Sequence, residues 1–515
     1  MKKQSSHKAA SGAKRLLCAL AAVILLCACQ AESLPDSSGS SDPAPAQSRN
    51  SESLPGSSTA SIPQSDSASS AANSANTLPP APSVCDVPFT QTESFPMPFE
   101  GGLMRDEYML VGETKGLILS VEQALYDYDT MWLLLEENFP YLNAIQTELG
   151  IDWRQVKENY RQEMEQKAVN GYLAPMSFME VIRNCVREFQ RVGHLFVLEK
   201  QEYAGYLNIY LSGENDLSKR LAELMSSPRS RDFYTAVKPY AAYTSPGNIS
   251  SNKDVIIEDL QAISNAITTG VVGDGIPYLK ITSFSAPVGS IEQEKLYNKL
   301  SQYFSSIAEK EHLIIDVRGN GGGNDGVWLF GIVPFLEQTT LKRDEFMGTK
   351  SGSLNLAIDP IIADSKGRYG TRYTDNSWQS DFPYIQPKSV EGVDIFLKSR
   401  QIIPKDTSQK YFSGKVWVLI DNGCYSATDA FTSFCRETGF ATLVGSTTGG
   451  NGKGANPHLM ALPYSGLLIR YDAYLSFNID GTCNGITGTP PDIPCIEGLD
   501  ALETCLQAIQ QEASA

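Results

Sequence analysis

The sequence predicts a mixed α/β protein in which a helical lobe precedes a core that contains a sheet. Between residues 118 and 192, apolar residues recur mostly at helical spacing, as in amphipathic helices with one buried face. After residue 276, apolar runs typical of buried strands alternate with helical stretches, which indicates layers of helices and sheet. With 515 residues, 42% of them hydrophobic, the chain is long enough to form a core in each part.

The first 28 residues have the features of an export signal. Basic residues are followed by an apolar stretch that is too short for a permanent membrane-spanning helix. It runs into Leu-Cys-Ala-Cys ending at Cys29, which resembles the bacterial lipobox, where cleavage precedes attachment of a diacylglycerol lipid to the cysteine. We expect a lipoprotein signal peptide at residues 1–28 and a lipid on Cys29, which would anchor the protein to the extracytoplasmic face of the cell membrane. An ordinary signal peptide is the alternative.

Residues 29–83 are predicted to be a disordered tether, because Ser, Pro, Ala and Asn dominate this segment and it lacks aromatic residues. Such a composition cannot bury enough apolar area to offset its conformational entropy. The formal net charge of the chain is −17, which argues against nucleic acid as a partner, because phosphate binding requires a basic surface.

Seven of the ten cysteines lie beyond the predicted anchor. Export permits disulfides, but seven cysteines cannot all pair with one another, and no Cys-x-x-Cys spacing indicates a zinc site. We expect most of the seven to be buried thiols, and we expect no cofactor. They are Cys85, Cys185, Cys424, Cys435, Cys483, Cys495 and Cys505.

Residues 84–195 are predicted to form a lead-in to about residue 117 and then the helical N-terminal lobe. Three apolar stripes mark its helices; they are Tyr126, Met131, Trp132, Leu135 and Phe139, then Trp153, Val156, Tyr160 and Met164, then Phe178, Val181, Ile182, Cys185 and Phe189. Residues 196–275 are a connecting region, in which residues 217–225 and 255–267 have the pattern of helices.

The core is predicted to occupy residues 276–515. Strands are expected at 277–282, 312–317, 415–421 and 441–445, and helices at 292–309, 427–437 and 498–511. An insertion at residues 324–414, rich in aromatic and charged residues, separates the second strand from the third. Two hypotheses for it stay open: it forms a wall of a substrate cleft, or it packs as an ordinary excursion.

Two turns that follow strands carry the candidate chemistry. The first holds Asp316 and Arg318 and continues into a glycine-rich run at residues 319–323. Because glycine accepts positive φ and has no Cβ, backbone N–H groups in such a run can point toward an anion or a developing oxyanion. The second places Ser426 at the start of a helix, where a serine is exposed for attack on a carbonyl. Together they indicate acyl transfer; the alternative is a plain helix cap formed by Ser426 and Asp429.

These motifs resemble the core of the tail-specific, or C-terminal-processing, serine proteases. The likeness covers residues 118 to 510 through motifs in the family's order: Val192-Gly193-His194, residues 276–281, the Asp-x-Arg-x-Asn-x-Gly-Gly run, Ser426-Ala427-Thr428-Asp429, residues 443–450 and residues 488–493. The resemblance implies a crotonase-like ββα-spiral core. The chain shows no Gly-Leu-Gly loop of a PDZ domain, so it is more similar to the tricorn-like and retinoid-binding-protein-like members without that domain.

The resemblance also implies roles for individual residues. Ser426 would be the nucleophile. The N–H group of Ala427 and that of Gly321 or Gly322 would hold the oxyanion. The Asp-x-Arg pair would brace the glycine-rich run rather than react.

The identity of the general base is inferred from a position at which this chain differs from the family pattern. Processing proteases use a lysine in a Gly-Lys-Gly turn downstream of the serine, but this chain has Asn451 there, and Lys453 comes two residues late. A lysine acts as a base only when it is buried at a defined place, so this shift argues against Lys453. Tricorn-like members use a histidine in a Gly-His context, which His194 matches. His312 and His458 are expected to be structural.

The residue that orients the histidine is missing from its expected position. Histidine-dependent members carry a glutamate just before the Gly-x-x-Pro-Asp turn, where this chain has Gly485. Asn484 or Asp480 would substitute if the loop bends differently. Without a substitute, activity would be reduced or lost.

Three functional hypotheses follow. The preferred one is a cell-surface serine endopeptidase that hydrolyses peptide bonds in proteins or peptides through Ser426, with His194 as general base. The alternative is a catalytically inactive lipoprotein on the same fold that binds peptides or apolar ligands. A structural protein of the cell envelope is the weakest hypothesis, because the glycine-rich run and Ser426 would then have no purpose.

Overall fold

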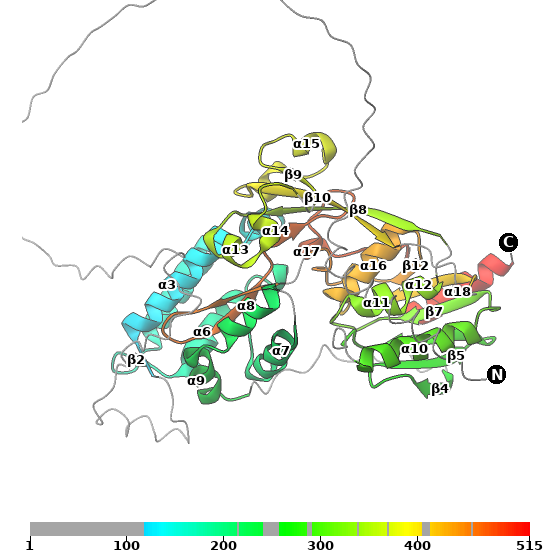
Figure 1. Ribbon diagram of the computed structural model, residues 1–515, viewed down its shortest axis with the longest axis horizontal. Coiled ribbons are helices and arrows are strands. Elements are labelled where there is room, and N and C mark those ends of the chain that lie inside the picture. Colours follow the sequence, from blue (N-terminus) through cyan, green and yellow to red (C-terminus); the bar gives the residue numbers. More distant parts are fainter. Residues whose placement is uncertain are drawn as a thin grey trace, which may run out of the picture. The chain divides into compact units, whose positions relative to one another are not determined.

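The computed structural model describes residues 118–213, 216–239, 257–285, 291–336, 339–367, 370–403, 412–454 and 457–514 (Figure 1). The predicted signal peptide at residues 1–28, the tether at 29–83 and the lead-in to residue 117 lie outside these residues and stay predictions. Within the described part of the chain, no helix combines the length and the apolar content that crossing a bilayer requires.

The helical lobe forms where the three apolar stripes predicted it. Its main helices are α3 (Val121–Asn138), α5 (Trp153–Gln166) and α6 (Pro175–Arg187), and α5 packs against both others. Local signals fix where they begin, because Ser120 caps α3, Asp152 caps α5 and Pro175 opens α6. The short elements of the lobe are β1 (Leu119–Ser120), its antiparallel partner β2 (Tyr172–Leu173), α4 (Leu142–Ala144) and a π-helical turn (Ile145–Leu149).

The described residues of the connecting region contain three further helices and the edge of the large sheet. After β3 (Phe196–Val197) come α7 (Lys200–Ser212), α8 (Asp216–Met225) and α9 (Pro228–Ala236), and α8 confirms the predicted helix at 217–225. The predicted helix at 255–267 is wrong, because this segment contains strand β4 (Glu258–Ala262). Pairing with β5 (Ile267–Val272) outweighs local helix preference. Gly270 permits the close approach, since a Cβ there would lie 2.8 Å from Glu258 O.

The core is built on a seven-stranded sheet in the order β16-β12-β11-β7-β6-β5-β4. Strands β16 to β6 pair in parallel, whereas β5 and β4 are antiparallel. The four predicted strands are confirmed as β6 (Ile276–Ile281), β7 (His312–Asp316), β11 (Lys415–Ile420) and β12 (Thr442–Gly445), and β16 (Ile493–Pro494) forms an edge. Because β7 and β11 are parallel neighbours, the glycine-rich run and the Ser426 turn leave the same edge of the sheet.

Both faces of this sheet are covered by helices. Leu313 and Ile315 pack on one face with α10 (Ile291–Ser306) and α16 (Ala427–Thr438). Ile314 and Trp417 pack on the other face with α18 (Ala501–Ala513). Continuous apolar strands are typical of a sheet that is buried on both sides. The three predicted core helices are confirmed, and so is the predicted fold class, a mixed α/β protein with a helical N-terminal region.

The middle of the insertion at residues 324–414 packs with the helical lobe, whereas its two ends pack with the core. Phe346 and Ile395 belong to the same buried cluster as Trp132 of α3, and the Asn355 side chain donates a hydrogen bond of 2.9 Å to Asn138 O. This supports the hypothesis of an ordinary packed excursion. Its elements are α11 (Gly326–Gly331), α12 (Val333–Leu336), β8 (Leu341–Thr349), α13 (Ser353–Ile358), α14 (Pro360–Ala363), β9 (Thr371–Tyr373), α15 (Trp378–Asp381), a 3-10 turn (Pro387–Val390) and β10 (Ile395–Ile403). Together with β15 (Tyr474–Ser476), its strands form a sheet in the order β15-β8-β10-β9.

A three-stranded sheet joins two distant parts of the sequence. Its order is β13-β14-β3, where β13 (His458–Ala461) and β14 (Leu468–Tyr471) come late in the chain and β3 follows the helical lobe. The 3-10 turn Val192–His194 lies just before β3, and Asp472 lies just after β14. The sheet therefore brings these two positions together. The helix α17 (Asn484–Thr487) lies in the loop that follows β15.

The six described cysteines are free thiols. Five of them are buried and Cys495 is exposed, which confirms the expectation of mostly buried thiols. Cys85 lies outside the described residues.

Candidate active site

Ser426 lies in a strained turn between β11 and α16. Its φ of 56° and ψ of −126° are rare for a residue other than glycine, and such a backbone costs roughly 1–3 kcal/mol. The hypothesis of a plain helix cap is wrong, because the Ser426 side chain makes no capping hydrogen bond. Asp429 holds neighbouring loops instead, accepting from Gly452 N–H at 3.0 Å and from the Thr489 hydroxyl at 2.8 Å. The strained turn therefore presents a hydroxyl that caps no helix in the described part of the chain.

The glycine-rich run lies directly against this turn. A Cβ on Gly322, whose φ is +105°, would lie 2.7 Å from Tyr425 O and 3.0 Å from Ala427 N, so only glycine fits there. Gly322 N–H donates to Asn320 Oδ1 at 2.9 Å, which leaves it engaged within its own loop. Among the described residues, the N–H groups of Gly321 and Ala427 have no acceptor. They are the two predicted oxyanion donors that remain free.

The Asp-x-Arg pair braces this run, as the sequence predicted. Arg318 donates to both oxygens of the buried Asp316 at 3.0 and 2.8 Å, and Tyr278 donates to it at 2.6 Å. Burial alone would raise the pKa of Asp316, but the hydrogen bond from Arg318 and the charge of Lys280 lower it to about 2. The carboxylate stays ionised and anchors the end of β7. A second carboxylate, Asp421, joins the two turns by accepting from Gly319 N–H at 2.8 Å.

His194 is buried beside a carboxylate that the sequence analysis missed. Its Nδ1 lies 2.9 Å from Asp472 Oδ2, and the two residues are only 3% and 2% exposed. Asp472 N–H also donates to Gly193 O at 2.7 Å. Because a carboxylate only accepts hydrogen bonds, Nδ1 carries the ring hydrogen and Nε2 is left as the basic nitrogen. Nε2 is buried and has no partner among the described residues.

The protonation of His194 follows from this setting. Burial lowers its pKa below the ordinary value, the Asp472 carboxylate opposes this effect, and the charges of Arg470 and Arg191 add to the lowering. The imidazole is therefore neutral near pH 7, the form in which it can accept a proton.

Two consecutive residues, Gly450 and Asn451, form hydrogen bonds with the serine turn and with the histidine turn. Gly450 O accepts the Ser426 N–H at 3.0 Å, and Asn451 Oδ1 accepts the Gly193 N–H at 2.6 Å. The ring of Tyr425, the residue before the serine, lies 4.9 Å from the imidazole, centroid to centroid. Asn451, which occupies the lysine position of the processing proteases, thus holds the histidine turn in place.

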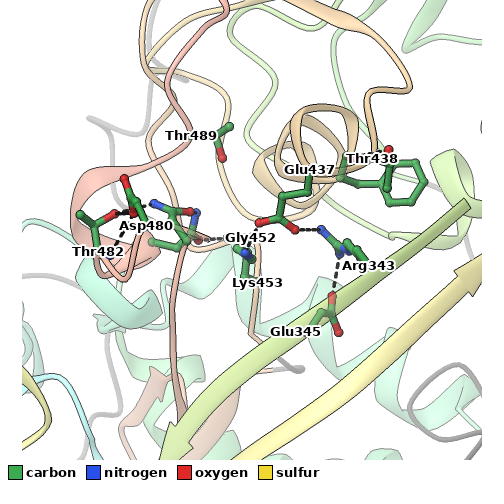
Figure 2. A network of polar contacts seen from close by, with 12 residues as sticks. Arg343, Glu345, Glu437, Thr438, Gly452, Lys453, Asp480, Thr482 and Thr489 are labelled. Atoms are coloured by element: carbon green, nitrogen blue, oxygen red, sulfur yellow. Dashed lines mark hydrogen bonds and ion pairs between the residues drawn. The ribbon is translucent and has the colours of Figure 1, made fainter. Parts of the chain in front are cut away.

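Lys453 forms an ion pair away from Ser426. Its buried amine pairs with Glu437, which also lies 3.6 Å from Arg343 of β8 (Figure 2). Glu437 is 11 residues along α16 from Ser426, which corresponds to roughly 16 Å of helix. The structure therefore does not bring Lys453 to the serine. His312, which accepts from the Trp417 indole at 3.3 Å, and His458, which is buried beside Asn355, have structural roles, as expected.

The prediction that Asn484 or Asp480 orients His194 is wrong. Asn484 Oδ1 accepts from Gly452 N–H at 3.1 Å, and the exposed Asp480 bonds Thr482 (Figure 2). Asp472 takes the orienting place instead. An acidic residue just after the apolar run at residues 467–469 was the available signal, but nothing local connects it to a histidine 278 positions earlier.

Gly485 leaves no room for the glutamate expected there from the resemblance to histidine-dependent proteases. A Cβ there would lie 2.7 Å from Tyr141 Cε1 and 2.8 Å from Asn451 Oδ1. We expect Gly485→Glu to lower the melting temperature and the activity, because it displaces Asn451 from the histidine turn. Thermal unfolding and peptide cleavage measure this, with the exposed Gly498, which has nothing within 4 Å of its Cβ, as the site of a Gly498→Asn control. Higher activity in Gly485→Glu would contradict the assignment of Asp472.

Comparisons with known proteins bear on the core. Residues 275–495 match the model of peptidase family S41; this range contains Ser426, the glycine-rich run and Asp472, whereas His194 lies before it. No curated protein matches the sequence. Among similar solved structures, mature CPAF is 14% identical, with 73% of this chain and 92% of that chain covered and a TM-score of 0.45. The photosystem II D1 C-terminal processing protease is 12% identical, with 72% of this chain and 92% of that chain covered and a TM-score of 0.33. A lipoprotein from Streptococcus agalactiae is 11% identical, with 76% of this chain and 97% of that chain covered and a TM-score of 0.36.

Proposed function

Because this chain belongs to peptidase family S41, whose members are serine peptidases, we propose that it hydrolyses peptide bonds with Ser426 as nucleophile and His194 as general base. The single observation that carries the proposal is the state of His194. Its Nδ1 is fixed by Asp472, and its buried Nε2 has no partner among the described residues.

The reaction follows the roles that these groups can fill. Ser426 Oγ attacks the peptide carbonyl while His194 Nε2 takes its proton. The N–H groups of Ala427 and Gly321 donate to the oxyanion of the tetrahedral intermediate. His194 then gives the proton to the leaving amine, which leaves an acyl group on Ser426. A water molecule attacks this ester in the same way, and Asp472 stabilises the imidazolium in both halves.

The same observation weighs against an inactive binding protein. That alternative depended on the absence of an orienting residue at Gly485. Asp472 supplies a carboxylate at hydrogen-bonding distance, so the reason for expecting an inert site is removed. The substrate class proposed is therefore a protein or peptide that is cleaved rather than only held.

A fluorophosphonate probe tests the proposal directly. The purified chain should be labelled once, on Ser426, and should cleave unfolded casein into peptides that mass spectrometry can map. Ser433→Ala is the matched control, since Ser433 is a buried serine on the same helix and its loss should change neither result. Absence of both labelling and cleavage in folded wild-type protein would reject the peptidase.

We further propose that the enzyme acts at the outer face of the cell membrane, held by a lipid on Cys29. The lipobox-like ending of the export signal supports this. Cys29→Ala should move the protein from the membrane fraction to the soluble fraction or leave an unprocessed precursor, with Cys18→Ala as the control. The measurement is fractionation with a radiolabelled palmitate, and a wild-type protein without lipid label would contradict the anchor.

A further inference from the structure

The histidine turn, which ends at His194, has a strained backbone. Three residues in and just before it have a positive φ although they are not glycine: 53° at Gln190, 65° at Arg191 and 47° at His194. Gly193 has a φ of 61° as well. Because positive φ is unfavourable for residues other than glycine, such a turn persists only when contacts with the rest of the fold hold it. These contacts therefore decide where the imidazole lies.

Hydrogen bonds from distant segments hold the turn. Two of them act on Gly193, whose N–H donates to Asn451 Oδ1 at 2.6 Å and whose carbonyl accepts the Asp472 N–H at 2.7 Å. Another acts on Arg191, whose carbonyl accepts the Tyr425 hydroxyl at 2.8 Å. Because Tyr425 directly precedes the candidate nucleophile, this bond joins the histidine turn to the serine turn itself.

The aromatic ring of Tyr425 also packs against the imidazole of His194. The two ring centroids are 4.9 Å apart, and the ring planes meet at 63°. The guanidinium carbon of Arg191 lies 5.0 Å from the centroid of the tyrosine ring, a cation–π distance at which the cation stabilises the position of the ring. Tyr425 thus contacts the histidine turn in two ways, through its hydroxyl and through its ring.

The hydroxyl of Tyr425 bears on the geometry of proton transfer. A strained turn relaxes when one of the contacts that hold it is removed. Loss of the hydrogen bond to Arg191 would let the imidazole leave the position from which it can take the proton of Ser426, and proton transfer is sensitive to small displacements.

The ring of Tyr425 bears on the hydration of the imidazole. Burial lowers the pKa of His194, which is only 3% exposed. The charged groups that face it act as well: Asp472, at the end of β14, raises this pKa, whereas Arg470 of β14 and Arg191 lower it. Tyr425 itself stays neutral, because burial raises its pKa. Removal of the ring would admit water and let the pKa of the imidazole rise toward its ordinary value.

We propose that Tyr425 is a positioning residue of the active site: its hydroxyl fixes the histidine turn at Arg191, and its ring keeps water away from His194. This inference rests on the proposed peptidase function and deepens it by giving a task to the residue that precedes the nucleophile. Tyr425 acts through the imidazole and takes no part in bond making or bond breaking.

Tyr425→Phe tests the hydroxyl, because it keeps the ring. We expect kcat for a fluorescence-quenched peptide at pH 8 to fall about 3- to 10-fold while KM stays within about twofold, as for loss of one hydrogen bond that matters in the transition state. Fluorophosphonate labelling should slow by a similar factor. Tyr203→Phe is the matched control, because the Tyr203 hydroxyl also donates to a backbone carbonyl, Met225 O at 2.7 Å, and its loss should leave kcat unchanged. A wild-type or higher kcat in Tyr425→Phe would overturn the role of the hydroxyl.

Tyr425→Leu tests the ring, because it removes the ring together with the hydroxyl. Activity falls as the pH drops through the pKa of His194, so a wetter imidazole moves this acidic limb to higher pH. We expect its midpoint to rise by roughly half a pH unit or more in Tyr425→Leu and to stay at the wild-type value in Tyr425→Phe. A residue that only stabilised the fold would not move the midpoint. Equal midpoints in the two variants would overturn the role of the ring.

The two proposals can fail separately. If folded wild type cleaves no peptide and takes no fluorophosphonate label, the peptidase is rejected. NMR titration of the full chain with isotope-labelled histidine, in which His194→Gln identifies the signal, then still measures the imidazole. A higher titration midpoint in Tyr425→Leu than in wild type supports the shielding by the ring, and the same midpoint in both overturns it.

Discussion

Ser426→Ala should abolish peptide cleavage, lowering kcat/KM by roughly 10⁴-fold or more, as expected for loss of a nucleophile. The stability of the fold should change by less than about 1 kcal/mol, because the Ser426 hydroxyl makes no capping hydrogen bond that alanine would lose. Cleavage of a quenched peptide and thermal unfolding measure the two effects.

The strained backbone supplies an internal check on this prediction. Glycine adopts a φ of 56° without penalty, so Ser426→Gly should be inactive but more stable than Ser426→Ala by about 1 kcal/mol. Ser433→Ala should retain full activity. If Ser426→Ala cleaves at the wild-type rate, the serine is not the nucleophile and the assignment fails.

His194→Ala should lower kcat/KM by roughly 10²- to 10⁴-fold, the usual loss when a general base is removed. Asp472→Asn should cause a loss of similar size, because an amide does not hold the Nδ1–H tautomer or stabilise the imidazolium. Lys453→Met is the control and should leave kcat/KM within a few-fold, since Lys453 pairs with Glu437. A larger loss in Lys453→Met than in His194→Ala would make the lysine the base.

The pH profile distinguishes catalysis from a merely structural role. A protonated imidazole cannot accept the serine proton, so activity falls as the pH drops through the pKa of His194. Burial places that pKa below about 6.5. Because the Asp472 carboxylate opposes the effect of burial, Asp472→Asn should move the midpoint to still lower pH. An unchanged midpoint with reduced activity would mean that Asp472 acts only through folding.

Local sequence patterns predicted much of the fold. The parallel strands of the core are mostly apolar, and the helices α3, α5 and α6 have buried faces, so each can be recognised without its neighbours. Strand β4 could not, because its five residues are all exposed and only pairing with β5 makes it a strand. Tertiary contact overrides local preference at such an edge.

The candidate site likewise contains residues that local sequence predicts and residues that only tertiary contacts reveal. Ser426 and the glycine-rich run can be predicted from the sequence, since a helix start and consecutive glycines are local signals. Asp472 does not, because its role depends on β14 pairing with β3. The role of Asn451 was hidden as well; a position read as a missing lysine instead holds the Gly193 N–H. Side-chain hydrogen bonds of this kind depend on contacts that sequence spacing does not reveal.

The pairing of β14 with β3 also affects when the proposed catalytic pair can form during synthesis of the chain. His194 is made early, whereas its carboxylate partner comes 278 residues later. A chain that is still emerging, or one truncated before β14, has neither the orienting carboxylate nor the strand that shapes the histidine turn. Contacts of such long range form late in folding. The order of the sequence thus delays assembly of the proposed catalytic pair until the core is nearly complete, so the proposed cleavage cannot begin while the chain is unfinished.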